Sequence, residues 1–483
     1  MSTVGVSDDQ SQYRVRILVA GFLAWMFAGL ENSLFILIHR QMMLELLGPS
    51  TPENVVTQWF AFNQAAFMLG AAAGGWLFGA LGDRFGRTRA LAWSVLCYSL
   101  LTLAAWFVTD ARLMWIVRFL ACLGFGGTWP NAVALVSEAW PAASKPLMAG
   151  VMGTAANFGF VLLGLIGLCF EIRDDSWRWV LLVGASPAVI GVWTLLAVPE
   201  SAKWLASRSQ LALSESTRLN APNPPLPDPV WEGSNERQQV RGRASASPDT
   251  APGIRLLFQR PLLQRTLLGI ALGAVPVIGT AANANWVVPW TDQVSAREEQ
   301  NKTAGDTGTT DASPKAAKTS DTQSTGKPQK AKQGPKQKAM AQITRSSGAI
   351  VGSLMGGLIA SLVGRRLTYF LISLATFLAS TVLFGMLSPG QPWFGTATFL
   401  LGLFGVTYFG WLPLFLPELF PTSVRAAGSG ISFNSGRIIA AAVVLYVGLR
   451  MDQFAGDYGR IGLWSGMIYV VGMIIIWFAP AKS

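Results

Sequence analysis

The stretch "SEAWPAASKPLMAG" at residues 137–150 returns in altered form as "PELFPTSVRAAGSG" at residues 417–430. In both copies a glutamate, Glu138 or Glu418, is followed by proline three residues on, a basic residue at seven and glycine at twelve. The offset between the copies, 418 − 138, is 280 residues. Earlier in each half, "GALGDRFGR" (79–87) aligns with "GLIASLVGR" (357–365) at an offset of 278, or 357 − 79. Because the copies keep their order at nearly one offset, we expect two parallel halves of similar architecture.

The composition around these repeats is typical of a membrane protein. Hydrophobic residues make up 51% of the 483 residues and charged residues only 13%, against about 25% charged in average soluble domains. The net charge of +11 is spread over segment ends and two polar loops, so we expect no nucleic-acid partner. Cys97, Cys122 and Cys169 lie singly in apolar segments. They form no metal-ligand spacing or disulfide framework, and we expect neither a metal nor a cofactor.

Apolar segments of ~20 residues, the length that crosses a bilayer, recur along both halves. They fall at 17–38, 57–81, 90–109, 113–137, 147–170 and 178–198, and again at 262–290, 342–363, 367–387, 393–416, 426–448 and 461–479. We therefore predict an all-α membrane protein with twelve transmembrane helices. They form two pseudo-symmetric six-helix bundles, 17–198 and 262–479, in a chain that acts as a monomer in the lipid bilayer.

Polar stretches separate or interrupt these bundles. Residues 199–261 contain "NAPNPPLPDP" (220–229) and are expected to form a linker loop. Residues 291–339 hold almost no large apolar side chain, so we expect a disordered outer loop. Lys and Arg in the short loops favour a cytoplasmic location for the linker and for the tails 1–16 and 480–483, in a cell (inner) membrane. The polar start has no cleavage site after the first apolar run, so we expect no removable signal peptide.

Four motifs resemble those of the major facilitator superfamily. "GALGDRFGRTR" (79–89) is similar to the loop signature between its second and third helices, and "RFLACLGFGG" (118–127) to its fourth-helix signature. "PESAKWL" (199–205) and "PELFPTSVRAAG" (417–428) resemble motifs of the sugar-porter and metabolite (organic acid)–proton symporter branches. The resemblance implies the major facilitator fold, alternating access and a substrate site between the halves.

The chain departs from these branches at several positions. Ser361 stands where the second copy of the loop motif often has an acid, and Ala202 and Lys203 replace Pro and Arg. The tail lacks the P-E-T-K-G that would follow the twelfth helix of a sugar porter, which counts against a sugar substrate. The fifth segment lacks the Gly-Pro motif of drug–proton antiporters, which counts against efflux.

Charged residues at the repeated positions indicate a gate. Gly79, Gly82 and Gly86 carry no side-chain bulk, so we expect neighbouring helix ends to approach closely there. The charged groups nearby are expected to close the inner side of the transporter when it is open outward. They are Asp83, Arg84, Arg87, Glu138 and Glu200 in the first half, and Arg365, Arg366, Glu418 and Arg425 in the second. The alternative is that these charges only mark the cytosolic boundary.

A glutamate, Glu31, interrupts the apolar run "WMFAGLENSLFILI" (25–38). A charged side chain at the centre of a membrane helix costs about 2.5–3.5 kcal/mol on insertion scales, so such residues usually have a function. We expect Glu31 to carry a proton. The resemblance to metabolite–proton symporters, which have an acidic residue in the first helix, implies the same. The alternative is a structural hydrogen bond to a neighbouring helix.

Arg437 in the eleventh segment is expected to complement Glu31 and to bind a substrate carboxylate, whose geometry a planar guanidinium matches. By the offset of 280, or 437 − 157, it corresponds to Asn157 in the fifth segment. The resemblance implies that both segments line the cavity. Arg118 is expected to have a structural or coupling role.

The apolar segments contain further polar residues. Arg345 opens the eighth segment and is expected to extend to the outer surface. His39 at the outer end of the first segment is expected to be interfacial, with pH sensing as the alternative. Side chains that would complete the pocket, each equally able to join helices, are Asn63, Gln64, Trp129, Asn131, Asn283, Asn285, Tyr408 and Trp411.

The sequence therefore predicts a secondary active transporter that imports a small organic anion, a carboxylate, together with a proton. A sugar or polyol facilitator or symporter is one alternative, and a non-transporting sensor on the same fold is another. We find no nucleophile–base constellation or phosphate loop, so we do not expect an enzyme.

Overall fold

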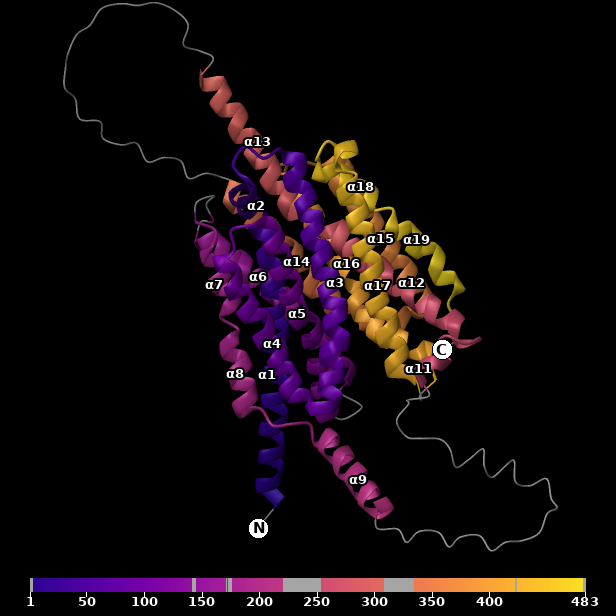
Figure 1. Cartoon of the computed structure of the whole chain (residues 1–483). Coiled ribbons are helices and arrows are strands. Elements are labelled where there is room, and N and C mark those ends of the chain that lie inside the picture. The colour runs from indigo at the N-terminus through magenta and orange to yellow at the C-terminus, as the bar shows by residue number, and fades with distance from the viewer. Residues whose placement is uncertain are drawn as a thin grey trace, which may run out of the picture.

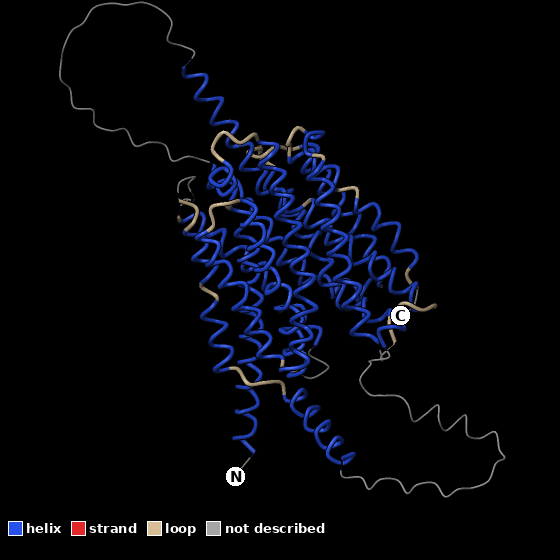
Figure 2. Tube along the Cα trace, viewed as in Figure 1, coloured by secondary structure: helices blue, strands red, loops and turns tan. Residues whose placement is uncertain are grey.

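The structure, a computed structural model, describes residues 3–140, 145–170, 172, 176–219, 253–307, 334–421 and 424–480. Within these ranges the chain is helical apart from short connections, and no strand is present (Figure 2). Both termini lie at the same end of the molecule (Figure 1). We call this end, which also carries the linker helix α9 (Ala202–Leu219), the terminal end, and the opposite end the loop end.

The first half consists of long helices joined by short connections. They are α1 (Thr3–Leu37), α2 (His39–Leu47), α3 (Glu53–Phe85), α4 (Arg87–Ala104) with η1 (Ala105–Phe107), α5 (Ala111–Ala139), α6 (Lys145–Cys169), α7 (Trp179–Ala185) and α8 (Ala188–Ala197). Pro187 separates α7 from α8, because proline lacks the amide proton that a continuous helix needs.

The second half follows the short helix α11 (Gly253–Leu256). Its elements are α12 (Leu262–Ala282), η3 (Ala284–Trp286), α13 (Val287–Thr307), α14 (Gly334–Val363), α15 (Arg365–Met386), α16 (Phe394–Phe415), η4 (Leu416–Leu419), α17 (Arg425–Leu449), η6 (Met451–Phe454), α18 (Tyr458–Ser465), α19 (Ile468–Ile475) and η7 (Ile476–Phe478).

Twelve stretches of the described helices are long and apolar enough to cross a membrane, six in each half. The prediction of an all-α protein with twelve transmembrane helices in two bundles is thus confirmed. Large apolar side chains on the outside of the bundles are exposed, for example Leu196 at 83% and Leu362 at 76%. Lipid contact accounts for such exposure, because no water-soluble surface would gain from it.

Glycines determine how closely α3 packs against α5. A Cβ atom at Gly74 would lie 1.9 Å from the carbonyl oxygen of Leu123, and one at Gly82 would lie 2.1 Å from Oδ1 of Asn131. Gly86 has a φ of +112°, which side chains disfavour. Gly79 differs from the expectation, since a Cβ there would meet nothing within 4 Å. No described neighbour faces that side of α3, so the close approach depends on the other glycines.

The halves meet along two helix pairs, which we call the seams: α3 with α17, and α6 with α14. Small residues bring the backbones together at both seams. A Cβ at Gly448 would lie 2.7 Å from Cβ of Ala61, and one at Gly153 would lie 2.7 Å from Oγ of Ser353. A substrate that crosses the molecule between the halves therefore has to pass between the seams.

The expected disordered loop at 291–339 is wrong for its two ends. Residues 291–307 continue α13 and residues 334–339 begin α14, while 308–333 lie outside the described residues, as do 220–252 of the linker. Composition misses the two helix ends because their polar groups are satisfied by pairing. Asp292 lies 3.4 Å from Lys338, and Ser295 donates a 2.8 Å hydrogen bond to Gln337.

Candidate functional site

A buried ion pair joins two helices of the first half. Nη1 of Arg118 on α5 lies 2.7 Å from Oε1 of Glu31 on α1, and the two side chains are 2% and 0% exposed. Nη2 of Arg118 also donates to Oδ1 of Asn32 at 3.2 Å, and its guanidinium lies 3.9 Å from the ring centre of Phe35. The second carboxylate oxygen of Glu31 has no hydrogen-bond partner among the described residues. A carboxylate held by one arginine, with a free oxygen, is able to take up a proton.

Arg437, the expected complement of Glu31 and ligand of a substrate carboxylate, forms no ion pair with Glu31. Arg437 on α17 is 9% exposed, and its Nη1 donates to the carbonyl oxygen of Ala71 on α3, in the other half, at 3.1 Å. Its guanidinium lies 4.9 Å from the ring centre of Phe433. Arg437 is therefore at one seam and pairs with no carboxylate among the described residues, whereas Arg118 neutralises Glu31. Helix rotation, which a sequence offset does not specify, decides this partner.

The expectation that Arg345 extends to the outer surface is also wrong. The residue is 4% exposed and lies well inside α14, which begins at Gly334 and not at the expected residue 342. Its guanidinium lies 5.2 Å from the ring centre of Phe160 on α6, across the other seam. One turn earlier, Gln342 donates a 3.0 Å hydrogen bond to the carbonyl oxygen of Phe160. The sequence could have indicated this burial only if the helix had been predicted to begin in the polar residues before 342, which places the basic residue inside it.

Four expected pocket residues form hydrogen bonds within a single half. Asn131 donates to the carbonyl oxygens of Phe78 at 3.0 Å and Gly127 at 2.9 Å. Asn283 ties α12 to α15 and α18 through Ser380 Oγ at 2.8 Å and the Gly462 carbonyl at 2.6 Å. Tyr408 donates to Oγ of Ser373 at 2.8 Å. Trp411 donates to the carbonyl oxygen of Arg365 at 3.1 Å. These contacts agree with the alternative that such residues join helices.

The other expected pocket residues keep polar or aromatic groups available. Asn63, Gln64 and Asn285 are buried and have side-chain atoms without hydrogen-bond partners among the described residues. Asn157 on α6 is half-buried. Trp129 is half-buried too, and its ring centre lies 4.9 Å from that of Trp25. Groups of this kind are those that a polar ligand needs for orientation.

Charged residues at the terminal end pair within their own half. Arg87 lies 2.6 Å from Asp83 and 3.6 Å from Glu138. Glu200 accepts from the backbone amide of Thr88 at 3.0 Å, and Glu138 accepts a short hydrogen bond from Ser201. The linker helix α9 joins them, because Trp204 donates to the carbonyl oxygen of Asp83 at 2.9 Å. The expected first-half gate residues are thus brought together around one helix end.

The second-half counterparts are partly described. Arg365 lies 2.6 Å from Glu418. Arg366 donates a short hydrogen bond to the carbonyl oxygen of Ala479, and Arg84 in the first half accepts one at its carbonyl from Arg208. The side chains of Arg425 and Ser361 lie outside the described residues.

The loop end carries polar contacts between the halves that the sequence did not indicate. Lys338 on α14, 1% exposed, donates to Oε1 of Gln41 on α2 at 2.9 Å. Gln41 in turn donates to Oδ2 of Asp292 on α13 at 3.4 Å. We call Gln41, Asp292 and Lys338 the loop-end cluster. It joins α2 of the first half to α13 and α14 of the second through buried groups.

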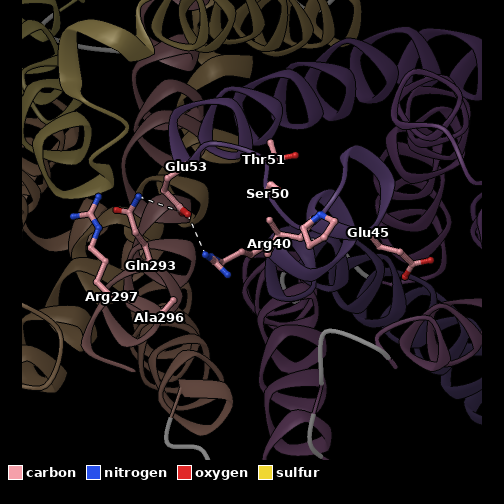
Figure 3. Close-up of a pocket in the computed structure, with 10 residues that line it drawn as sticks. Arg40, Glu45, Ser50, Thr51, Glu53, Gln293, Ala296 and Arg297 are labelled. Carbon is pink, nitrogen blue, oxygen red and sulfur yellow. Dashed lines mark hydrogen bonds and ion pairs between the residues drawn. The ribbon is translucent and has the colours of Figure 1, made fainter. Parts of the chain in front are cut away.

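A hollow of about 800 Å³ lies beside this cluster. Figure 3 shows Glu53 between Arg40 and Gln293, which approach it from either side. The distances are 3.1 Å from Arg40 and 3.4 Å from Gln293, so Glu53 contacts both halves. The remaining lining residues are Leu44, Glu45, Pro49, Ser50, Thr51, Ala296 and Arg297. Charges of both signs line the hollow, so it does not favour one ionic ligand.

His39 is buried next to the loop-end cluster and is not interfacial as expected. It is 1% exposed, its Nε2 donates to the carbonyl oxygen of Val56 at 2.9 Å, and its ring packs edge-on against Phe60. Burial lowers the pKa of His39 to about 4, and the positive charges of Arg40 and Lys338 act in the same direction. The Val56 carbonyl and the Asp292 carboxylate oppose this shift. The imidazole is therefore neutral in this conformation at neutral pH.

Comparisons with known proteins agree with this architecture. The family described as "Sugar (and other) transporter" matches residues 15–284, more than half of the chain. The cis,cis-muconate transport protein of Acinetobacter baylyi is 24% identical over 433 residues, which cover 88% of this chain and 84% of that protein. A probable 4-methylmuconolactone transporter of Cupriavidus pinatubonensis is 25% identical over 412 residues, covering 85% and 78%.

Solved structures show the same fold. The inward open conformation of the xylose transporter XylE from E. coli superposes with a TM-score of 0.65 and 14% identity, over 98% of this chain and 97% of that chain. These relatives are transporters and not enzymes. With twelve spans in two repeated halves and a family match over more than half of its length, the chain belongs to the sugar (and other) transporter family of the major facilitator superfamily.

Proposed function

We propose that the protein imports a small organic anion, a carboxylate, together with a proton. The observation that carries this proposal is Arg437, a buried arginine at a seam with no carboxylate partner among the described residues. A guanidinium in this setting needs a negative charge, and its planar fork matches a carboxylate. The names of the relatives support the same class of substrate, since they include muconate and 4-hydroxybenzoate transporters.

Glu31 is the proposed proton carrier. Its pair with Arg118 joins α1 to α5, and a proton on the carboxylate would cancel the charge that holds Arg118. Loading and release of the proton would then change the packing of these two helices. A bistable packing change of this kind couples a local charge to movement of a whole domain.

Alternating access would come from movement of the two halves about the seams. We infer that the terminal end is cytoplasmic, in a cell (inner) membrane, and that the chain acts as a monomer. The charged residues around Asp83, Arg87 and Glu138, with Arg365 and Glu418, would close that end when the loop end opens. Their present pairing within each half leaves them available for this exchange.

Proteoliposomes with an internal pH dye test the proposal. Organic acids are added outside to wild type, Glu31→Gln, Glu31→Asp and an exposed control, Arg112→Gln. We expect internal acidification with at least one acid in wild type and control, its loss in Glu31→Gln and partial retention in Glu31→Asp. Size-exclusion profiles and melting temperatures establish that each variant is folded. Acidification that persists at the wild-type rate in folded Glu31→Gln would place the proton elsewhere.

A sugar or polyol transporter is the second candidate, because the matching family includes sugar transporters. The same liposomes separate the two functions. Uptake of a radiolabelled neutral sugar or polyol, with no response to any acid, would support the second candidate and contradict the first.

A further inference from the structure

The buried charges of the described helices do not balance. The buried side chains with a formal charge are Glu31, Arg118, Asp292, Lys338, Arg345 and Arg437. Glu31 pairs with Arg118, and Asp292 pairs with Lys338. In the described part of the chain Arg345 and Arg437 have no carboxylate within ion-pair distance. The region between the halves therefore carries two positive charges that no carboxylate of the described residues neutralises.

The two guanidiniums without a carboxylate partner have similar surroundings. Arg345 lies 5.2 Å from the ring centre of Phe160, and Arg437 lies 4.9 Å from that of Phe433. An aromatic ring covers one face of a guanidinium and leaves its in-plane N–H groups free for a carboxylate. Nε of Arg345 is buried and has no partner among the described residues. Arg437 has one hydrogen bond among the described residues, from Nη1 to the carbonyl oxygen of Ala71. Both guanidiniums thus keep N–H groups that a carboxylate can accept.

Residues that neighbour the two arginines contact the same helix, α12. Gly436, the neighbour of Arg437, packs on Ala274 of α12, where its Cβ would lie 3.0 Å from the Ala274 nitrogen. Tyr469 is close enough to Arg345 to interact with its charge, and it packs on Gly279 of the same helix. Five residues of α12 (279 − 274) correspond to about 7.5 Å of helix rise. Arg345 stands at the α6–α14 seam and Arg437 at the α3–α17 seam, so a ligand between the seams faces both.

We propose that one substrate molecule binds Arg345 and Arg437 together through two carboxylates, which makes the transported anion the dianion of a dicarboxylic acid. This inference rests on the proposed function and refines its substrate class. A monocarboxylate would satisfy one arginine and leave the other buried with its charge. The dianion is therefore preferred over an acid of the same shape with one charge.

A matched pair of probes tests this preference. Each dicarboxylic acid, from four-carbon linear diacids to the three benzenedicarboxylates, is compared with its monomethyl ester, which keeps the shape but has one carboxylate. Uptake into proteoliposomes is measured for wild type, Arg345→Gln and the exposed control Arg112→Gln. We expect wild type and control to prefer at least one diacid over its monoester by tenfold or more. Arg345→Gln should lower this ratio by tenfold or more, since a charge-assisted hydrogen bond is lost.

Melting temperatures give a readout that a structural arginine would not reproduce. Without ligand, Arg345→Gln should melt at or above wild type, because an unpaired buried charge is removed. Arg118→Gln should melt lower, because it leaves Glu31 buried and unpaired. The preferred diacid should raise the melting temperature of wild type and raise that of Arg345→Gln much less.

The outcomes separate this inference from the proposed function. If monoesters are carried with a proton but no diacid is preferred, the two-arginine site is wrong while organic-acid transport stands. A diacid preference that survives Arg345→Gln, or an Arg345→Gln variant that melts lower and loses both probes equally, also overturns it. If wild type carries no acid at all, the proposed function fails and this inference fails with it.

Discussion

The two ends of the helix bundle hold their charged side chains in different ways. At the loop end, hydrogen bonds cross between the halves: Lys338 to Gln41, Gln41 to Asp292, Gln293 to Glu53 and Asn54 to Asp452. At the terminal end, the ion pairs of Arg87 and of Arg365 connect residues of the same half. Contacts that cross between the halves must break when the halves separate, while contacts within a half move with it. The difference therefore indicates that this conformation is held together at the loop end.

The strongest test of this comparison removes the buried lysine. Lys338→Met leaves Asp292 buried, with Gln41 as its remaining partner among the described residues. Breaking a buried pair on one side costs about 3–5 kcal/mol. Because this cost applies only while the loop end is closed, we expect the open state to be strongly favoured. Spin labels at the exposed positions Ser50 and Gln453, in a background with the three cysteines replaced by serine, should report a new, longer distance.

The double variant Lys338→Met with Asp292→Asn is the matched control. Replacing both members of a buried pair is often nearly neutral, so it should return most of the population to the short distance. Asn54→Ala removes an exposed hydrogen bond between the halves at the same end and should change little. A double variant that opens further than Lys338→Met would mean that the unpaired charge of Asp292 is not what opens the loop end.

The sequence predicts the helices better than it predicts these contacts. Twelve apolar segments and a repeated offset near 280 residues are local or periodic signals, and they specify the two bundles before any packing is known. Glu31 was recognisable because a charge in an apolar run is costly. Its partner was not, because Arg118 and Arg437 are both basic residues in apolar helices, and only the rotation of α5 and α17 distinguishes them.

Residues 334–341 show why the loop end was missed. Their sequence, "GPKQKAMA", is polar and follows a long polar stretch, so composition assigns them to a loop. In the structure they begin α14, since Lys338 and Gln337 find partners on α2 and α13. Burial of a lysine depends on side chains nearly 300 residues away, which single-sequence patterns do not contain. Asn131 and Asn283 form hydrogen bonds within one half, whereas Asn63 and Asn285 have side-chain atoms without partners among the described residues. All four are asparagines in apolar segments, so the sequence does not distinguish the two groups.

A lower pH is expected to open the loop end less than Lys338→Met does, through protonation of His39. The pKa of this buried imidazole is about 4, against about 6.5 for an exposed histidine. Its neutral form stabilises the closed loop end above pH 6.5, and this contribution is lost as the pH falls from 6.5 toward 4. We expect the long Ser50–Gln453 distance to grow over this range in wild type and much less in His39→Gln. Equal growth in both would assign the pH response to other groups.

Among these substitutions, we expect one at the terminal end to have the smallest effect on this conformation. The side chain of Asp83 is 72% exposed, so its pair with Arg87 contributes about 0–1 kcal/mol. Asp83→Asn should leave the melting temperature and the loop-end distance close to wild type. If these charges close the terminal end in the opposite state, the same variant should slow acid uptake about 2- to 30-fold, which corresponds to a coupling of about 0.5–2 kcal/mol. Asp452→Asn removes an exposed acid at the loop end but keeps the acceptor oxygen for Asn54. This variant should not slow acid uptake. A full transport rate in Asp83→Asn would mean that the ion pairs only mark the membrane boundary, and the contrast between the two ends would then reflect a single gate at the loop end.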